Sequence, residues 1–199
     1  MESRFLPKIL TAIIVLLLVP CSLCLAQAET LLDQAEDYFD SDQYQQAETI
    51  CEQIITEYPD SDYALEAQEK LTVLYVHWGK QAQADTAYQQ LLSNYSERAN
   101  IAKAVDHVAD AYRNEENYTK AKELYEYAVA TWPQAEHAVN SQTALVKLGI
   151  AGHEGIDTQE EFDKLTTVFS GYENLAERVD EIADFTTVRL FDLGNAVTI

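Results

Sequence analysis

Few residues of this chain have the type and spacing that catalysis requires. The sequence contains four histidines, which stand singly, and adjacent acids at Glu115-Glu116 and Glu160-Glu161. Neighbouring side chains of a helix point in different directions, so neither acid pair is placed to act as an acid and a base. The sequence lacks a Gly-rich phosphate loop, a G-x-S-x-G elbow, an H-E-x-x-H helix and paired Cys-x-x-Cys motifs. We therefore expect a protein that is not an enzyme and carries no cofactor.

Two short acidic segments, Asp40-Ser41-Asp42 and Asp60-Ser61-Asp62, come nearest to a calcium site. Calcium loops place their oxygen ligands at a spacing such as D-x-D-x-D-G, which neither segment has. Both segments suit a turn or a helix cap instead, because Asp and Ser side chains hydrogen-bond nearby backbone amides. We expect no metal site.

The first 28 residues have the features of a secretory signal peptide. Arg4 and Lys8 supply a basic start, residues 9–19 form an uncharged apolar run, and Ala26-Gln27-Ala28 supplies small residues for cleavage. The sequence thus predicts an exported protein, periplasmic or secreted, whose mature chain begins at Glu29. In its mature form this protein would have no membrane segment.

Two alternatives to simple cleavage stay open. Residues 9–26 reach the length of a membrane-spanning helix, so the leader would serve as an anchor if it were retained. Cys21 and Cys24 lie where a lipidated cysteine would fall. Cleavage after Ala28 would remove both and leave Cys51 as a lone thiol, which we expect to be buried in the core.

The strong negative charge excludes one class of partner. The chain has 13 basic and 34 acidic residues, a formal net charge of −21. A surface this acidic repels phosphates, so nucleic-acid binding is not expected. The same charge favours a cationic protein or peptide.

The elements that must position any site form an internal repeat. A small residue recurs every 37 positions, followed four and seven positions later by larger or apolar residues, and these spacings define one face of a helix. The three series are Ala47, Ala84, Ala121 and Thr158; Cys51, Tyr88, Tyr125 and Phe162; Ile54, Leu91, Ala128 and Leu165. A turn former follows each helix, at Pro59, Ser96, Pro133 and Ser170.

A second helix precedes each of these, with its own series at Ala35, Thr72, Ala109 and Val146. Three positions later come Tyr38, Tyr75 and Tyr112, with Gly149 in the fourth unit. Short polar turns join the two helices of each unit, which predicts antiparallel pairs. The expected fold is all-α, in units near 29–61, 62–98, 99–135 and 136–172. A partial unit over 173–199 runs through Gly194-Asn195-Ala196 and ends six residues into its second helix.

This pattern resembles the tetratricopeptide repeat (TPR), and the third unit matches best. The matching residues there are Ala109, Tyr112, Asn117, Tyr118, Ala121, Tyr125, Ala128 and Pro133. The resemblance implies a right-handed solenoid of antiparallel helix pairs, although the period of 37 is longer than the usual 34. In style the chain is similar to exported bacterial TPR proteins.

The resemblance also implies a site, because the first helices of such repeats line a concave groove. The groove positions carried over to this chain are Glu66, Glu69, Lys103, Asp106, Asp110, Glu177, Asp180 and Asp184. The implied groove is mostly acidic, which argues against the carboxylate clamp of chaperone-binding relatives and favours a basic peptide.

The sequence therefore predicts a protein-binding scaffold of the cell envelope or secreted space. Two other roles are compatible with the same repeats. The region would serve as a structural spacer or oligomerisation module of a longer envelope protein, or as the regulatory repeat region of a larger enzyme.

Overall fold

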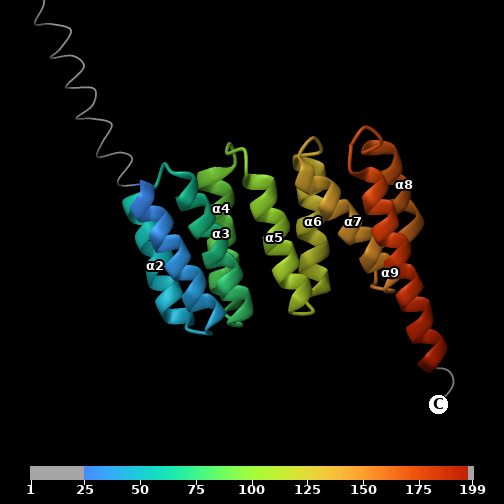
Figure 1. Ribbon diagram of the computed structural model, residues 1–199, viewed down its shortest axis with the longest axis horizontal. Helices are drawn as coiled ribbons and strands as arrows, with labels where there is room; N and C mark the ends of the chain where they lie inside the picture. The colour runs from blue at the N-terminus through green and yellow to red at the C-terminus, as the bar shows by residue number, and fades with distance from the viewer. Residues whose placement is uncertain (1–24, 197–199) are drawn as a thin grey trace, which may run out of the picture. The chain divides into compact units, whose positions relative to one another are not determined.

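The computed structural model describes residues 25–196, and this part of the chain is all-α. Its nine helices pack as sequential antiparallel pairs (Figure 1). They fall into two compact parts that divide between Asn94 and Tyr95. The predicted signal peptide, with Cys21 and Cys24, lies almost entirely on residues 1–24, outside the described range. No helix within the described range is both long and apolar enough to cross a membrane.

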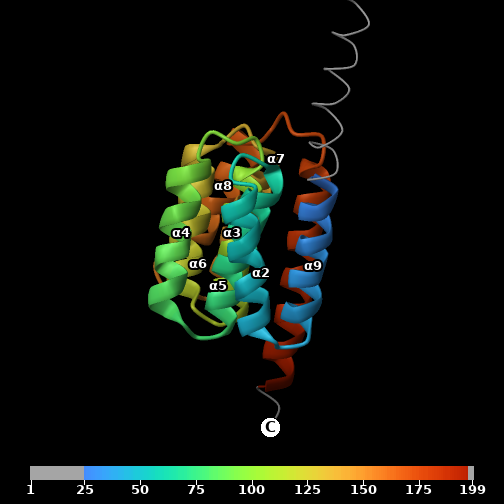
Figure 2. The ribbon, with the colours of Figure 1, turned by 90° about the vertical axis from the view of Figure 1, so that its left-hand side faces the viewer.

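The N-terminal part contains two helix pairs. Residues 25–40 are helical and pair with α2 (Tyr44–Glu57), and α3 (Asp62–His77) pairs with α4 (Gln81–Tyr95), as Figure 2 shows for α3 and α4. Ser61 begins α3 as an N-cap whose hydroxyl accepts a hydrogen bond from the amide of Ala64 at 3.1 Å, which confirms the capping interpretation of this segment.

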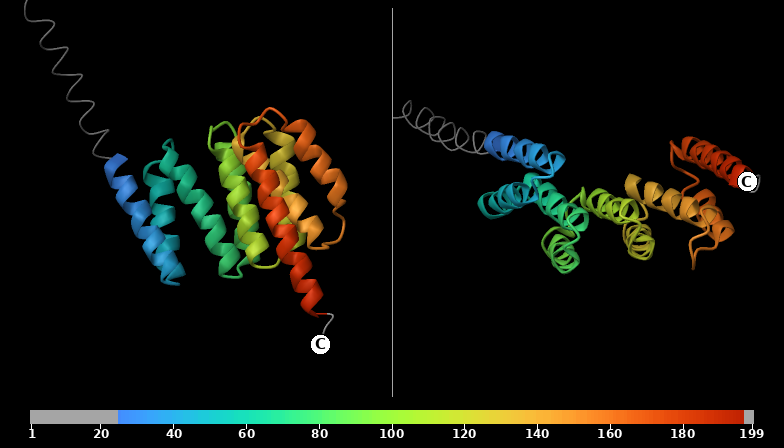
Figure 3. Two further views of the ribbon diagram at one scale, coloured as in Figure 1. Left: turned by 45° about the vertical axis from the view of Figure 1, so that its right-hand side comes forward. Right: turned by 90° about the horizontal axis from the view of Figure 1, so that it is seen from below.

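The C-terminal part contains two further pairs and a last long helix. Here α5 (Ile101–Asn114) pairs with α6 (Tyr118–Thr131), and α7 (Glu136–Ile150) pairs with α8 (Thr158–Val168). The first helices of the pairs also touch one another, because α7 contacts both α5 and α9 (Leu175–Ala196). Figure 3 shows these five helices from two directions. Three first helices therefore lie side by side in this part.

The turn inside each of the first three pairs is built in the same way. The carbonyls of Tyr38, Tyr75 and Tyr112 accept hydrogen bonds from the amide five residues later, at 2.8, 2.9 and 2.8 Å. One residue before each donor the backbone is left-handed, at Asp42, Gly79 and Glu116. This six-to-one bond closes the helix end in the manner of a Schellman motif. The predicted turns are thus confirmed, and their geometry repeats every 37 residues.

The predicted helix faces form the core. Ala47, Ala84 and Ala121 are buried, and so are Ile54, Leu91, Ala128 and Leu165 on the same face. Small residues let the paired helices approach closely, while the larger residues fill the space between neighbouring pairs. Cys51 is a free, buried thiol as expected, and burial raises its pKa to about 12.

The fourth pair differs from the others at Gly149. A Cβ atom at this position would lie 2.6 Å from Oγ1 and 3.1 Å from Cα of Thr158, so α8 approaches α7 where the other pairs carry a tyrosine. The helix α8 begins only at Thr158, whereas α4 begins three residues before the equivalent Ala84. Residues 151–157 accordingly form a longer connection without lengthening the repeat.

The expected turn of the fifth unit is absent. The helix α9 runs unbroken from Leu175 to Ala196 through Gly194 and Asn195, whereas the sequence predicted that the fifth unit would already be in its second helix here. It projects beyond the ends of α7 and α8 in Figures 1 and 3. One glycine costs a helix only about 1 kcal/mol relative to alanine, which is too little to end it without a cap or a proline.

Candidate functional site: a groove on the first helices

A groove of about 350 Å³ lies on the C-terminal part and is lined by α5, α7 and α9. Asp106, Asp110 and Arg113 reach it from α5. Asn140 and Lys147 are among its residues from α7, and Arg178 and Glu181 come from α9. Each helix presents residues three, four or seven positions apart, which is the spacing of a single helix face.

Asp106 forms the floor of the groove and is only 5% exposed. The hydroxyl of Ser141 on α7 donates a 2.6 Å hydrogen bond to its Oδ1, and His137 Nδ1 lies 3.4 Å from its Oδ2. Both carboxylate oxygens are therefore engaged by α7. A buried carboxylate held in this way ties α5 to α7 and fixes the position of His137.

The residues Asp106, His137 and Ser141 have the types of a hydrolase triad but not its geometry. A nucleophilic serine must be exposed and hydrogen-bonded to the histidine, with the aspartate on the far side of the ring. Ser141 is fully buried and donates directly to Asp106, while His137 lies against the other oxygen of the same carboxylate. This arrangement activates no nucleophile.

The wall of the groove on α5 is held by Asp110. Its carboxylate accepts a hydrogen bond from the Tyr125 hydroxyl of α6 and pairs with Arg113 at 2.9 Å. Burial, followed by the negative charge of Asp110 and the hydrogen bond to it, raises the pKa of Tyr125. The phenol therefore stays protonated and acts as a fixed donor that orients Asp110.

The wall on α9 is held by Glu181. Its carboxylate accepts hydrogen bonds from Lys147 of α7 and, at 2.9 Å, from Arg178 of α9. Partial burial would raise the pKa of Glu181, but the hydrogen bonds and positive charges of Lys147 and then Arg178 outweigh it and lower the pKa. The pair joins α9 to α7 at the edge of the groove.

The charge of this groove differs from the acidic surface that the sequence implied. Three carboxylates, at Asp106, Asp110 and Glu181, meet three cationic side chains, at Arg113, Lys147 and Arg178. With neutral histidines the groove is formally uncharged, in a chain whose net charge is −21. His107 and His137 both line the groove, with their rings nearly perpendicular and 5.9 Å between centroids.

The structure brings only some of the eight predicted groove residues together. Asp106 and Asp110 line the groove, and Lys103 is half-buried elsewhere on α5. On α9 the side chains of Glu177, Asp180 and Asp184 are exposed, while Arg178 and Glu181 face the groove instead. In the N-terminal part, Glu66 and Glu69 are half-buried on α3.

The prediction omitted the contribution of α7, although the repeat contained the signal. Positions 37 residues after Lys103, Asp106 and Asp110 are Asn140, Thr143 and Lys147, and all three line the groove. The roles of Arg113 and Arg178 depend on side-chain contacts, for which the repeat pattern holds no signal.

Within residues 25–196 no group of three His, Cys, Asp or Glu side chains is placed to hold a metal ion. The groove is thus a surface of paired charges, amides and hydroxyls. Such groups bind by hydrogen bonds and charge complementarity, which suits a polypeptide segment.

Sequential antiparallel helix pairs with a 37-residue period, and a groove on the first helices, define the class of helical-repeat proteins. Two segments, residues 29–61 and 66–97, match the model of the tetratricopeptide repeat family. The chain thus contains tetratricopeptide repeats, and repeats of this kind imply a scaffold for protein–protein interaction. A search of curated proteins finds no significant match.

Proposed function

We propose that this protein is a non-enzymatic scaffold that binds a polypeptide segment in the groove between α5, α7 and α9. The observation that carries the proposal is the convergence of three first helices on one polar groove whose floor is fixed by Asp106. A floor whose two carboxylate oxygens are both held by α7 keeps the groove open without a ligand, which lowers the entropic cost of binding.

The proposed partner is basic. Asp110 and Glu181 remain 39% and 42% exposed although each has a partner within the protein. Exposed ion pairs are worth only about 0–1 kcal/mol, so a partner cation can share or exchange them. The negative charge of the whole chain steers such a partner toward the surface and acts mainly on the association rate.

A pair of conservative substitutions tests this proposal. Asp110→Asn with Glu181→Gln keeps hydrogen-bond acceptors at both positions and removes two negative charges from the groove. The matched control, Asp163→Asn with Glu173→Gln, removes two charges from exposed positions elsewhere in the C-terminal part. The groove pair should weaken capture of the partner from envelope extract at least tenfold, while the control pair should not. Equal capture by both variants would contradict the proposal.

We further propose that the protein is exported. The basic start, the apolar run of residues 9–19 and the small residues at positions 26–28 support this proposal. Expression with the leader in a bacterial host, followed by intact-mass measurement of the periplasmic fraction, should return a chain beginning at Glu29. A full-length chain in the membrane fraction would instead favour an anchor, and an added lipid mass at Cys21 or Cys24 would favour lipidation.

An oligomerisation role is the second candidate. Val168 on α8 and Val188 on α9 are large apolar side chains that are 57% and 61% exposed. Exposed apolar side chains such as these suit contact with a second copy of the chain. Size-exclusion chromatography with light scattering separates the two roles, because the scaffold proposal requires a monomer and the oligomerisation role requires a defined multimer.

A further inference from the structure

Two of the four histidines of the chain lie in the groove between α5, α7 and α9. They are His107 on α5 and His137 on α7. Histidine is the side chain that ordinarily gains or loses a proton between pH 5 and 8. Lysine, arginine and carboxylate side chains ordinarily keep their charges above about pH 5.5. The charge of the groove therefore depends on acidity through its two histidines.

His137 is held in the groove through one ring nitrogen. Its Nδ1 lies 3.4 Å from Oδ2 of Asp106, the buried floor of the groove, and Ser141 donates to the other oxygen of the same carboxylate. With Nδ1 directed at the floor, Nε2 is the atom at which the neutral ring takes up a second proton. The contact with Asp106 is the same before and after this step, so the ring changes its charge without dismantling the groove.

The other charged side chains of the groove balance one another. Three carboxylates and three cations surround the two histidines, and they come from all three helices: Asp106, Asp110 and Arg113 from α5, Lys147 from α7, and Arg178 and Glu181 from α9. The groove therefore carries no net formal charge with neutral histidines and a charge of +2 with both rings protonated. The two ring centroids are 5.9 Å apart, so the second proton places a positive charge next to the first.

We propose that acidification releases a basic partner from this groove through the protonation of His107 and His137. The inference rests on the proposed function, because it concerns the partner that the same groove would bind. Two added positive charges repel the lysine or arginine side chains that Asp110 and Glu181 would attract at neutral pH. The chain as a whole stays strongly acidic, so the loss of binding comes from the groove and not from the surface in general.

A short lysine peptide provides a probe whose own charge does not change over this range. The acetylated and amidated peptide Lys-Lys-Lys-Lys has no titrating end groups, and lysine ordinarily stays protonated below about pH 10. In an NMR titration of the isotope-labelled chain, the peptide should give saturable shifts at the amides of Asn140 and Thr143, which line the groove. Its affinity should be at least fivefold lower at pH 5.5 than at pH 7.5.

Matched histidine substitutions locate the response. His107→Gln with His137→Asn removes both titrating rings, and the new amide at position 137 can still donate to Asp106. This variant should bind the lysine peptide about equally at the two pH values. His153→Gln is the control, because His153 lies outside the groove and stacks on Tyr118 at 3.7 Å between ring centroids. The control should keep the response of the original chain, and equal responses in the two variants would overturn the proposal.

A measurement on the original chain does not depend on the folding of any variant. Binding and protonation are reciprocal, so a peptide that protons release must itself displace protons from the groove. Saturation with the lysine peptide near pH 6.5 should move the ring proton resonances of His107 and His137 toward those of the neutral ring. The resonances of His153 should not move. Unchanged resonances of His107 and His137 at saturation would also overturn the proposal.

The inference and the proposed function fail in different ways. If the lysine peptide gives no shifts in the groove at either pH, the basic partner of the proposed function is contradicted, and the proton-dependent release is contradicted with it. If the peptide binds in the groove equally well at both pH values, the proposed function stands and only the release by acid is wrong.

Discussion

Gln68 and Gln142, 74 residues apart, make the same buried hydrogen bond in the two parts of the chain. The side-chain amide of Gln68 donates to the carbonyl of Ala87 at 3.0 Å, and that of Gln142 donates to the carbonyl of Glu161 at 2.9 Å. Each acceptor lies 19 residues after its donor, on the second helix of the pair. Val105 takes the intermediate position and is buried without a polar group. The repeat in the core therefore has a period of two helix pairs.

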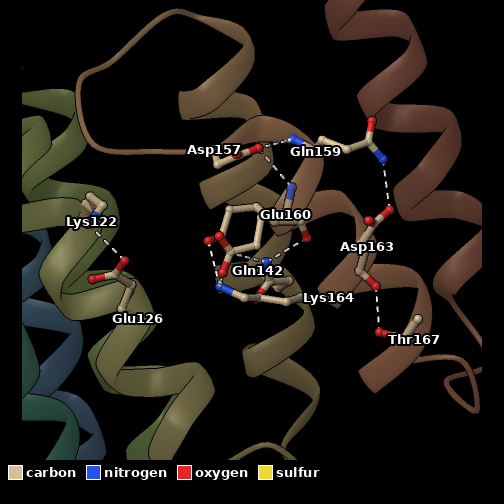
Figure 4. A network of polar contacts seen from close by, with 10 residues as sticks. Lys122, Glu126, Gln142, Asp157, Gln159, Glu160, Asp163, Lys164 and Thr167 are labelled. Carbon is tan, nitrogen blue, oxygen red and sulfur yellow. Dashed lines mark hydrogen bonds and ion pairs between the residues drawn. The ribbon is translucent and has the colours of Figure 1, made fainter.

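The two glutamines differ in how much their loss should cost. The Gln142 amide also donates to the Glu161 carboxylate at 2.7 Å, next to Lys164, in the network of Figure 4. Gln142→Met keeps the side-chain volume but removes a hydrogen bond to a buried charge, so it should lower the free energy of unfolding by about 1.5–3 kcal/mol. Gln68→Met removes one neutral hydrogen bond and should cost about 0.5–1.5 kcal/mol. Urea unfolding checks the order, and a larger loss in Gln68→Met would contradict it.

Gly149 should resist substitution because of its contact with Thr158. In Gly149→Ala the new methyl group meets the backbone of Thr158 at 3.1 Å, and backbone cannot move aside as a side-chain tip can. We expect a loss of about 1–3 kcal/mol of stability from overpacking. Gly171→Ala is the matched control, since a Cβ atom there meets nothing within 4 Å. Thermal unfolding of both variants should separate them, and equal melting temperatures would refute the close approach.

Glu181 should make stability depend on acidity. Its pKa in the folded chain lies below the ordinary value of 4.5, so its pairing with Lys147 and Arg178 stabilises the fold fully above that value. This contribution is lost as the pH falls through the lowered pKa. The stability difference between the original chain and Glu181→Gln should therefore be largest at neutral pH and should shrink toward zero well below 4.5. A difference that grows on acidification in urea unfolding would show the opposite shift.

Cys51 should not react in the folded protein. Thiolate is the reactive form, and burial raises the pKa of this thiol to about 12. A chain that begins at Glu29 has Cys51 as its single thiol, and in its native state it should therefore give almost no signal with a thiol reagent at mildly alkaline pH. The same chain unfolded in urea should react completely. Rapid labelling of the folded protein would mean that the Cys51 site opens readily.

Much of the fold could be predicted because it depends on spacing alone. The series that includes Ala47, Ile54 and Leu91 follows from the period of a helix face, and all three residues are buried. The turn at Gly79 could be predicted because glycine readily adopts the left-handed backbone found there. The first groove residues, Asp106 and Asp110, follow from the phase of the repeat because α5 is packed between α6 and α7, as a repeat helix should be.

The residues that α9 contributes to the groove could not be predicted by carrying the groove positions from one repeat to the next. A shift of one residue turns a helix face by about 100°, and α9 presents Arg178 and Glu181 where the repeat phase gave Glu177 and Asp180. This helix packs on α7 and buries Ile182 in the core of the C-terminal part, so its rotation is set by that contact. The ion pairs of the groove could not be predicted either, because the sequence does not show which lysine or arginine side chain reaches each carboxylate.

Site-specific photo-crosslinking tests the central claim, that the groove between α5, α7 and α9 holds a protein partner. A benzophenone side chain placed at Asn140, which lines the groove, should crosslink the partner in envelope extract. The same side chain placed at Asp163, exposed on α8, should give no such product. Crosslinks from Asp163 and none from Asn140 would contradict the account, because the partner would then bind away from the first helices.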